Sequence, residues 1–453
     1  MTPTGERSAS VTPEIRRLRE VGCRRILAKV LADNDNSKNQ IYLGGSFDIL
    51  NELPLHSWSS ETSGRQGIIR AAIDWSWLQP DGTLAHAPGA QLILYPQYPE
   101  VRLSGILRGT SRGAAPSEII ARRRAGRVLL LGLRDGGDVV ALAVDADDSG
   151  AARLRSLLDG RSGPGALVEA ARFDIADEEI RDDRSRLLDA LRRIRDRGWT
   201  DGQRMLGDGT IIPYDAANGV GYTLEALLGV RPNAVGAPDY LGWEVKALTA
   251  GRSGHVASSK RITLMTPNPT GGDLAELGPS AFMRLYGYPD RRSPQRLNFG
   301  GTYSARRPTG NRSLQLMLDG FDPKAPSRFS ADGAVSLEDP TGHQAMEWSL
   351  TKMIGLWNHK HSKAVYLPAD ADLHGGRRRY RYGSTAYLGT GTDFSRLLLG
   401  VARGEVVYDP GIKLEHAGSD REKAKVRHQF RVAFGSLPSL YARWEEIPLE
   451  SAA

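Results

Sequence analysis

Hydrophobic and polar positions alternate in short runs over residues 38–145 of this 453-residue chain. Clusters of Gly, Pro, Asp and Asn separate the runs, which read QIYLG, GIIRAAIDW, AQLILY, VRLSGIL, RVLLLGL and DVVALAVD. Short apolar runs between turn residues are typical of the strands of all-β barrels and sandwiches. The pattern therefore predicts a β-rich N-terminal module, preceded by a helix over residues 13–31 and followed by a helical segment over residues 150–172.

From residue 177 onward, helical spacing and strand-like runs are mixed. Residues 177–199 carry a single apolar stripe among arginines and aspartates, which predicts the first helix of a second domain. Further helices are predicted over residues 221–229, 343–360 and 391–404, and strands over residues 239–248, 261–267, 364–370, 406–415 and 428–435. This mixture predicts an α/β (α+β) fold. Because residues 173–180 contain four acids and have no core periodicity beyond Phe173, Ile175 and Ile180, we expect one domain over residues 1–175 and another over residues 176–453.

Charge and cysteine content narrow the classes of protein. The chain has 60 Lys and Arg against 53 Asp and Glu, and this net charge of +7 favours a polyanionic partner such as nucleic acid. A slightly basic protein without such a partner is the competing interpretation.

The single cysteine, Cys23, excludes a disulfide framework and a cysteine-rich zinc site. The polar N-terminus is unlike a signal peptide and residues 128–133 are too few to span a bilayer, so we expect a cytoplasmic protein without a membrane partner.

The stretch PDYLGWEVKAL, residues 238–248, combines two acids with a lysine. Side chains alternate along a strand, so Glu244 and Lys246 are expected on one face while their neighbours point into a core. A bend at residues 241–242 would bring the carboxylate of Asp239 back to Glu244. Two carboxylates form a hard oxygen site that suits Mg²⁺, and a lysine beside them stabilises charge on a phosphodiester under attack. This is the arrangement of the PD-(D/E)xK nucleases, although an ordinary surface strand with a Glu–Lys pair also fits the triad alone.

The longer string GYTLEALLGVRPNAVGAPDYLGWEVKAL resembles the MvaI/BcnI restriction endonuclease family of MutH-like nucleases. The shared order is Thr-Leu-Glu on a helix, Leu-Gly-hydrophobic, Asn, Pro-Asp, Gly and Glu-x-Lys. The matching residues here are Thr223 to Glu225, Leu228 to Val230, Asn233, Pro238 and Asp239, Gly242, and Glu244 to Lys246. The resemblance covers residues 180–445, roughly, and implies a restriction-endonuclease-like catalytic domain of the MutH type.

The same resemblance assigns roles to four residues. It implies that Asp239 and Glu244 hold Mg²⁺, that Lys246 serves the attacking water, and that Glu225 is a helix-borne acid of the site. Glu225 also fits a purely structural role, as an acid near a helix N-terminus that the helix dipole stabilises.

The implied activity is Mg²⁺-dependent, sequence-specific cleavage of double-stranded DNA. The resemblance further implies a catalytic unit able to act as a monomer, although a dimer stays open, and a cognate DNA methyltransferase encoded nearby. A MutH-like strand-nicking repair enzyme is the close alternative. A DNA-binding regulator with an inactive nuclease site is disfavoured because Asp239, Glu244 and Lys246 are intact. A metalloenzyme that does not act on DNA is disfavoured by the basic charge and by the lack of a His-rich site.

Candidate DNA contacts lie in two segments of the second domain. The segment KRITLMTPNP resembles the strand that follows the catalytic strand, so Lys260 and Thr263 are expected to line the DNA. The C-terminal part of the family is similar to residues 406–441, and the candidates there are Lys413, Arg427, His428, Gln429 and Arg431. On a strand Arg427, Gln429 and Arg431 would share a face, from which Arg and Gln read guanine and adenine edges. A solvated basic surface is the competing interpretation.

The N-terminal module is distantly similar to the DNA-recognition effector domain of EcoRII-type endonucleases, a small pseudobarrel. LAKVLADNDNSKNQIYLGG and YPEVRLSGIL carry that similarity. It implies DNA contacts at Asn36, Lys38 and Arg102. The competing interpretation is a structural or oligomerisation domain.

Overall fold

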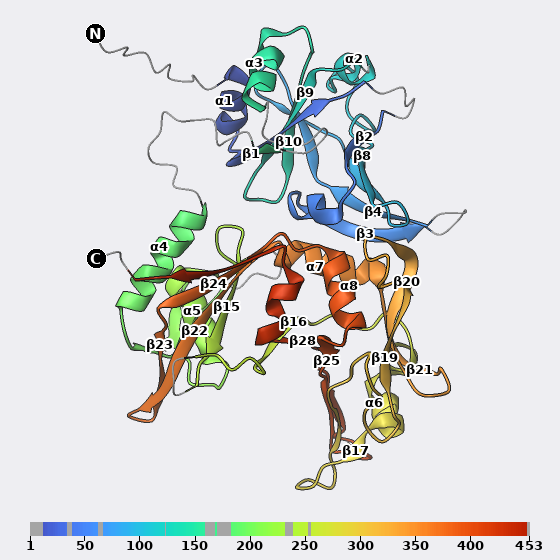
Figure 1. Ribbon diagram of the computed structural model, residues 1–453, viewed down its shortest axis with the longest axis vertical. Coiled ribbons are helices and arrows are strands. Elements are labelled where there is room, and N and C mark those ends of the chain that lie inside the picture. The colour runs from blue at the N-terminus through green and yellow to red at the C-terminus, as the bar shows by residue number, and fades with distance from the viewer. Residues whose placement is uncertain are drawn as a thin grey trace. The chain divides into compact units, whose positions relative to one another are not determined.

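The chain divides into two compact units, Met1–Ile180 and Arg181–Ala453 (Figure 1). The computed structural model describes residues 12–33, 39–61, 67–122, 124–158, 168–169, 183–231, 239–251 and 255–450. No helix within these ranges is long and apolar enough to cross a membrane.

The first unit is rich in strands, as the sequence predicts. Its helices are α1 (Pro13–Glu20), the 3-10 helix η1 (Phe47–Asn51), α2 (Ser117–Ala121) and α3 (Ser149–Leu158). Its strands are β1 (Arg25–Leu31), β2 (Ile41–Gly44), β3 (Leu55–Glu61), β4 (Ile68–Ile73), β5 (Trp75–Leu78), β6 (Leu84–His86), β7 (Gln91–Tyr95), β8 (Glu100–Ser104), β9 (Arg127–Leu133), β10 (Val139–Val144) and β11 (Val168–Glu169). They form one sheet of order β11-β1-β9-β10-β5-β6 and another of order β2-β8-β7-β4-β3. Each of the six apolar runs identified in the sequence contains or overlaps one of these strands.

The helix predicted over residues 13–31 is wrong after Glu20. Gly22 lies in the left-handed region with φ of 87°, and the amide of Cys23 donates to the carbonyl of Leu18, which ends the helix. The chain then enters β1, which pairs with β9 along seven residues. The helical segment predicted over residues 150–172 is also wrong in part, because α3 ends at Leu158 and β11 pairs with β1 as a strand.

The second unit mixes helices and strands, which confirms the predicted α/β class. Its helices are α4 (Asp183–Asp196), α5 (Gly219–Leu228), α6 (Asp273–Tyr286), α7 (Leu350–His361), α8 (Phe394–Ala402) and the 3-10 helix η3 (Phe434–Leu440). Its first strands are β12 (Thr200–Asp201), β13 (Gln203–Met205), β14 (Ile211–Pro213), β15 (Glu244–Thr249) and β16 (Arg261–Met265). The strands that follow are β17 (Tyr288–Pro289), β18 (Leu297–Gly300), β19 (Gln315–Phe321), β20 (Phe329–Glu338), β21 (Gln344–Ser349), β22 (Lys363–His374), β23 (Arg377–Tyr382), β24 (Thr385–Thr390), β25 (Val406–Tyr408), β26 (Gly411–Glu415), β27 (Lys423–Lys425), β28 (Phe430–Ala433) and β29 (Arg443–Pro448).

The sheet that carries β15 is the centre of this unit. Its order is β12-β23-β22-β24-β29, and β15 runs parallel to β22. Figure 1 shows α4 and α5 against this sheet. Apolar residues of both helices pack against one face of β15, β22, β23 and β24. The helices contribute Leu191 and Leu224, and the strands contribute Val245, Val365 and Leu388. Alternation along β15 and β22 therefore leaves the opposite face of these strands available for polar groups.

The helix predicted over residues 343–360 is half wrong. Its first part, Gln344–Ser349, is β21, which pairs with β20, and only its second part is α7. The side chain of Ser349 accepts a hydrogen bond from the amide of Lys352, so it caps the N-terminus of α7. The indole of Trp348 is fully buried and donates to the carbonyl of Pro267, so tertiary packing holds this segment as a strand against its local helix propensity.

Candidate active site

A tight turn lies between Asp239 and Glu244. Tyr240 and Trp243 exchange two backbone hydrogen bonds of 3.0 and 2.9 Å. Leu241 and Gly242 have φ of 51° and 77°, and positive φ at both central positions is the signature of a type I′ turn. Asp239 is thereby folded back, and its Oδ2 accepts a hydrogen bond of 2.9 Å from the amide of Val245. The bend predicted at residues 241–242 is confirmed.

Glu244 and Lys246 share the face of β15 that points away from the core. The ammonium of Lys246 lies 2.7 Å from Oε1 of Glu244, and their side chains are 18% and 7% exposed. Val245, between them, is buried in the core cluster. The alternation that the sequence predicts for this strand is confirmed, and it brings an acid and a lysine into one partly enclosed place beside the turn.

A pair of tyrosines lies on the same face of the sheet. The register places Tyr366 of β22 beside Lys246, and Ala364 between Glu244 and Gly389 of β24. The small residue at position 389 makes room for Tyr441, because a Cβ there would lie 2.6 Å from its ring. The hydroxyls of Tyr366 and Tyr441 are 2.8 Å apart and buried. Burial raises the pKa of both hydroxyls, and the nearby negative charge of Glu244 raises both further.

Neither tyrosine is among the candidate site residues that the sequence pattern predicts. Tyr366 lies in a predicted strand, but its position beside Lys246 depends on the β15–β22 register. Tyr441 is 197 positions after Glu244 and has no local pattern that connects it to the site. Only the pairing of distant strands brings the three together.

The turn leads to a first prediction. Gly242→Ala should lower the rate of DNA cleavage, because an L-residue at φ of 77° is strained and the strain acts on the turn that holds Asp239. The matched control is Gly418→Ala, at φ of 78° and likewise with nothing within 4 Å of an added Cβ. Both variants should lose roughly 1–2 kcal/mol of stability, measured by urea unfolding, and only Gly242→Ala should lose cleavage. Equal activity in the two variants would show that the turn does not position the site.

Glu225 lies on α5 and is half-buried. Burial is the main reason why the pKa of Tyr382 is raised, and the charges of Tyr380 and then Glu225 raise that pKa further. Tyr382 belongs to the core face of the sheet, whereas Glu244 and Lys246 face the other way. Within the part of the chain that the structure describes, no three His, Cys, Asp or Glu side chains are grouped to hold a metal ion. The assignment of Glu225 to the site therefore stays a prediction.

The C-terminal candidates do not lie on one strand. β28 begins at Phe430, so the prediction that Arg427, Gln429 and Arg431 share a strand face is wrong. Gln429 is buried, and its carboxamide oxygen accepts from the Thr263 hydroxyl at 3.0 Å and from the Arg427 guanidinium at 3.0 and 3.3 Å. Arg427 is exposed, so the buried amide of Gln429 holds an arginine at the surface.

The remaining candidates differ in exposure. Lys260 and Lys413 are exposed, as a phosphate contact requires. Arg431 pairs with Asp409 at 2.6 Å and donates to the carbonyl of Arg261, so its guanidinium is already engaged. His428 is 5% exposed and Nδ1 of its ring is 2.7 Å from the Tyr408 hydroxyl. DNA-contact roles for all of these residues stay predictions.

Burial lowers the pKa of His428 to about 4. In the unfolded chain this histidine takes up a proton near its ordinary pKa of about 6.5. The contribution of the neutral, buried His428 to the free energy of unfolding is therefore fully present above that pH and is lost as the pH falls toward 4. The difference between the pKa values of His428 in the unfolded and folded chain corresponds to about 3 kcal/mol in the free energy of unfolding. Glutamine does not titrate, so His428→Gln should not lose stability in this way. The difference in free energy of unfolding between this variant and the wild type, measured with urea, should therefore shrink from pH 7 to pH 5. His343→Gln is the control, because Asp273 raises the pKa of His343 and its contribution disappears as the pH rises.

The candidates of the first unit are only partly described. Asn36 and Lys38 lie outside the described residues. Arg102 lies on β8, pairs with Glu100 and donates to Oε1 of Gln40 at 3.2 Å. Its guanidinium also lies 5.3 Å from the centroid of the Tyr95 ring. It is thus held by neighbours, and its role toward DNA stays a prediction.

A comparison with protein families matches residues 188–441 to the MvaI/BcnI restriction endonuclease family. This span is more than half of the 453 residues and contains Asp239, Glu244 and Lys246 with their turn and strand. The chain belongs to this family. The resemblance of residues 180–445 to this family is confirmed, and with it the assignment to the hydrolases as a sequence-specific deoxyribonuclease. The first structural unit lies outside the matched residues.

Solved structures of one restriction endonuclease are similar to this chain. "Restriction endonuclease MvaI-cognate DNA substrate complex" is 20% identical, with a TM-score of 0.45, over 60% of this chain and 100% of that chain. "Restriction endonuclease MvaI in the absence of DNA" is 18% identical, with a TM-score of 0.33, over the same shares. No curated protein sequence matches the chain.

Proposed function

We propose that this protein is a Mg²⁺-dependent endonuclease that hydrolyses phosphodiester bonds of double-stranded DNA at a specific sequence. The observation that carries the proposal is the joint placement of Asp239, Glu244 and Lys246, by a type I′ turn and the first three residues of β15. Membership of a restriction endonuclease family supports the substrate.

The donor set fits a magnesium ion. Mg²⁺ keeps several of its waters and is usually bound through one or two carboxylates together with substrate phosphates. Asp239 and Glu244 supply two such carboxylates. When bound, the ion would polarise the scissile phosphodiester and lower the pKa of a water molecule.

The chain's own groups position these carboxylates and the attacking water. The amide of Val245 orients Asp239 by a hydrogen bond. Lys246 is held by Glu244 at the same place, and its ammonium is a donor for the attacking water or for a charged phosphoryl oxygen. Partial burial strengthens both interactions, because solvent screens them less.

Two surfaces are proposed to contact DNA. One is in the second unit, where Lys260, Lys413 and Arg427 are exposed. The other is in the first unit, around Arg102 on β8. Phosphate contacts fix position along the duplex, and groove contacts select sequence.

The decisive experiment incubates the purified protein with a plasmid and Mg²⁺ and sequences the cut ends. We expect discrete ends at one short sequence, no cleavage in a chelator, and binding without efficient cutting in Ca²⁺, whose looser geometry suits the chemistry poorly. Nicks in one strand alone would favour the MutH-like repair enzyme. Binding without cleavage in Mg²⁺ would favour the DNA-binding regulator and reject the proposal.

A further inference from the structure

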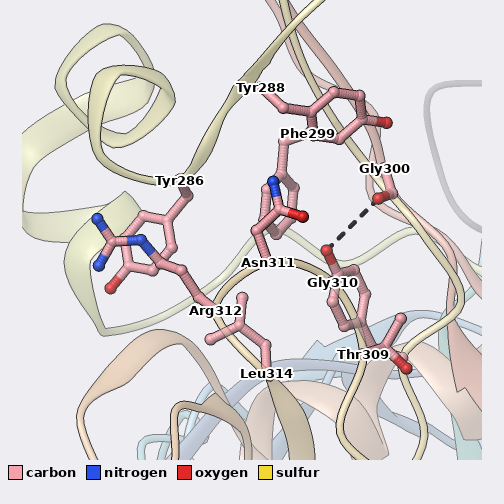
Figure 2. Close-up of a pocket in the computed structure, with 10 residues that line it drawn as sticks. Tyr286, Tyr288, Phe299, Gly300, Thr309, Gly310, Asn311, Arg312 and Leu314 are labelled. Carbon is pink, nitrogen blue, oxygen red and sulfur yellow. Dashed lines mark hydrogen bonds between the residues drawn. The ribbon is translucent and has the colours of Figure 1, made fainter.

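A small pocket lies in the second unit, away from β15, and four of the ten residues that line it are aromatic (Figure 2). Its volume is about 230 Å³, and the rings that line it are Tyr286, Tyr288, Phe299 and Tyr303. This is below the roughly 300–1,000 Å³ of pockets for drug-sized ligands. The space therefore suits a single flat ring system.

The floor of the pocket is rigid. The Phe299 and Tyr303 rings stack at 5.5 Å and 11°, and both residues are no more than 3% exposed. The hydroxyl of Tyr286 donates to Asp273 at 2.7 Å, and Tyr303 exchanges backbone hydrogen bonds with Tyr408. Tyr288, in contrast, is 41% exposed at the rim. The buried rings are thus held in place before any ligand binds.

A tight loop carries two polar side chains into the wall. Thr309 and Leu314 close the loop with backbone hydrogen bonds of 2.8 and 2.9 Å, and Gly310 and Ser313 have positive φ. Asn311 and Arg312 lie at its tip and both line the pocket. The Arg312 guanidinium lies 4.8 Å from the centroid of the Tyr286 ring, as Figure 2 shows. The pocket therefore combines ring faces with a carboxamide that both donates and accepts.

The surrounding segment is strongly basic. Residues 286–314 contain six arginines and one acidic residue, Asp290. Arg291, Arg292 and Arg307 are exposed and form no ion pair with any residue that the structure describes. Together with Arg312 in the pocket wall, this basic segment matches the phosphates on either side of a nucleotide.

We propose that this pocket receives one unstacked nucleobase of the DNA substrate. The inference rests on the proposed function, because it takes DNA as the ligand. A nucleobase has a flat face for the exposed Tyr288 ring and a polar edge for Asn311, and Arg312 with the basic segment holds the flanking backbone. Enzymes that extrude a base read it in this way, by stacking between rings and by hydrogen bonds to its edge.

The test uses the full-length protein in Ca²⁺ with a duplex that contains its cleavage sequence. Fluorescent base analogues, 2-aminopurine and pyrrolocytosine, replace one base at a time. We expect a change of emission at one position that its neighbours do not show. Tyr288→Ala should alter the emission at that position and weaken binding of the specific duplex by roughly 5- to 160-fold, the range for loss of one stacked base. Leu285→Ala is the control, since Leu285 is 44% exposed on the neighbouring helix and does not line the pocket.

Two results would overturn the inference. One is normal cleavage by the wild type with no position-specific change of emission, which rejects base extrusion and leaves the endonuclease standing. The other is a loss of binding in Tyr288→Ala and Arg312→Gln that is equal for specific and unrelated duplexes, which makes the rim a phosphate-binding surface alone. Failure of the wild type to cut any DNA in Mg²⁺ would instead reject the proposed function.

Discussion

Asp239→Asn should bind DNA like the wild type and lose cleavage by roughly 10²- to 10³-fold, the usual cost of removing one group that stabilises transition-state charge. Asparagine keeps a side-chain oxygen that accepts from the amide of Val245, so the turn is preserved and only the negative charge is lost. Cleavage and filter-binding assays on the cognate duplex measure the two effects separately.

Asp208→Asn is the matched control for this substitution. Asp208 also accepts a hydrogen bond of 2.9 Å from a backbone amide, that of Thr210, in an exposed turn. It should retain full cleavage. If Asp239→Asn retains more than about a hundredth of wild-type turnover, Asp239 is not a metal ligand.

Separation of the two structural units should leave cleavage in the C-terminal fragment. A fragment over residues 181–453 contains α4, whose Leu187, Leu191 and Ile194 are buried in the core beneath β15, and it contains every proposed catalytic residue. We expect it to fold and cut DNA with weaker binding, because one set of phosphate contacts is lost. The slope of log affinity against log salt should fall by about 0.9 for each lost contact.

The complementary fragment over residues 1–180 should bind duplex DNA and show no cleavage. If it binds no duplex at low salt, the first unit is not a DNA reader, and the catalytic assignment is unaffected. A 181–453 fragment that folds by circular dichroism but does not cut would instead mean that the first unit completes the site.

Local patterns predicted most elements correctly. Alternation along residues 244–249 predicted both the strand and the shared face of Glu244 and Lys246, because a strand has a period of two whatever surrounds it. The Leu-Gly pair predicted the bend before it, since glycine tolerates positive φ at low cost. Patterns of this kind require only neighbouring residues.

Predictions failed where tertiary pairing competes with local propensity. Residues 344–349 have helix-forming composition, yet they pair with β20 and bury Trp348. Residues 25–31 continue an apolar helical spacing, yet they pair with β9 over their full length. Ladder hydrogen bonds and burial between distant segments outweigh differences in intrinsic propensity, which amount to a few tenths of a kcal/mol per residue.

The sequence by itself determined the family and predicted the chemistry of the central motif, because the order of residues around Asp239, Glu244 and Lys246 is local and specific. Only the tertiary structure decided which residues from distant parts of the chain meet. Tyr441 reaches Tyr366 because Gly389 leaves space on one face of the sheet, and Gln429 meets Thr263 because the segment before β28 lies beside β16. A shift of one residue in strand register would turn Tyr366 of β22 and Thr263 of β16 to the other face of their sheets. No local pattern reports the register between segments so far apart in the chain.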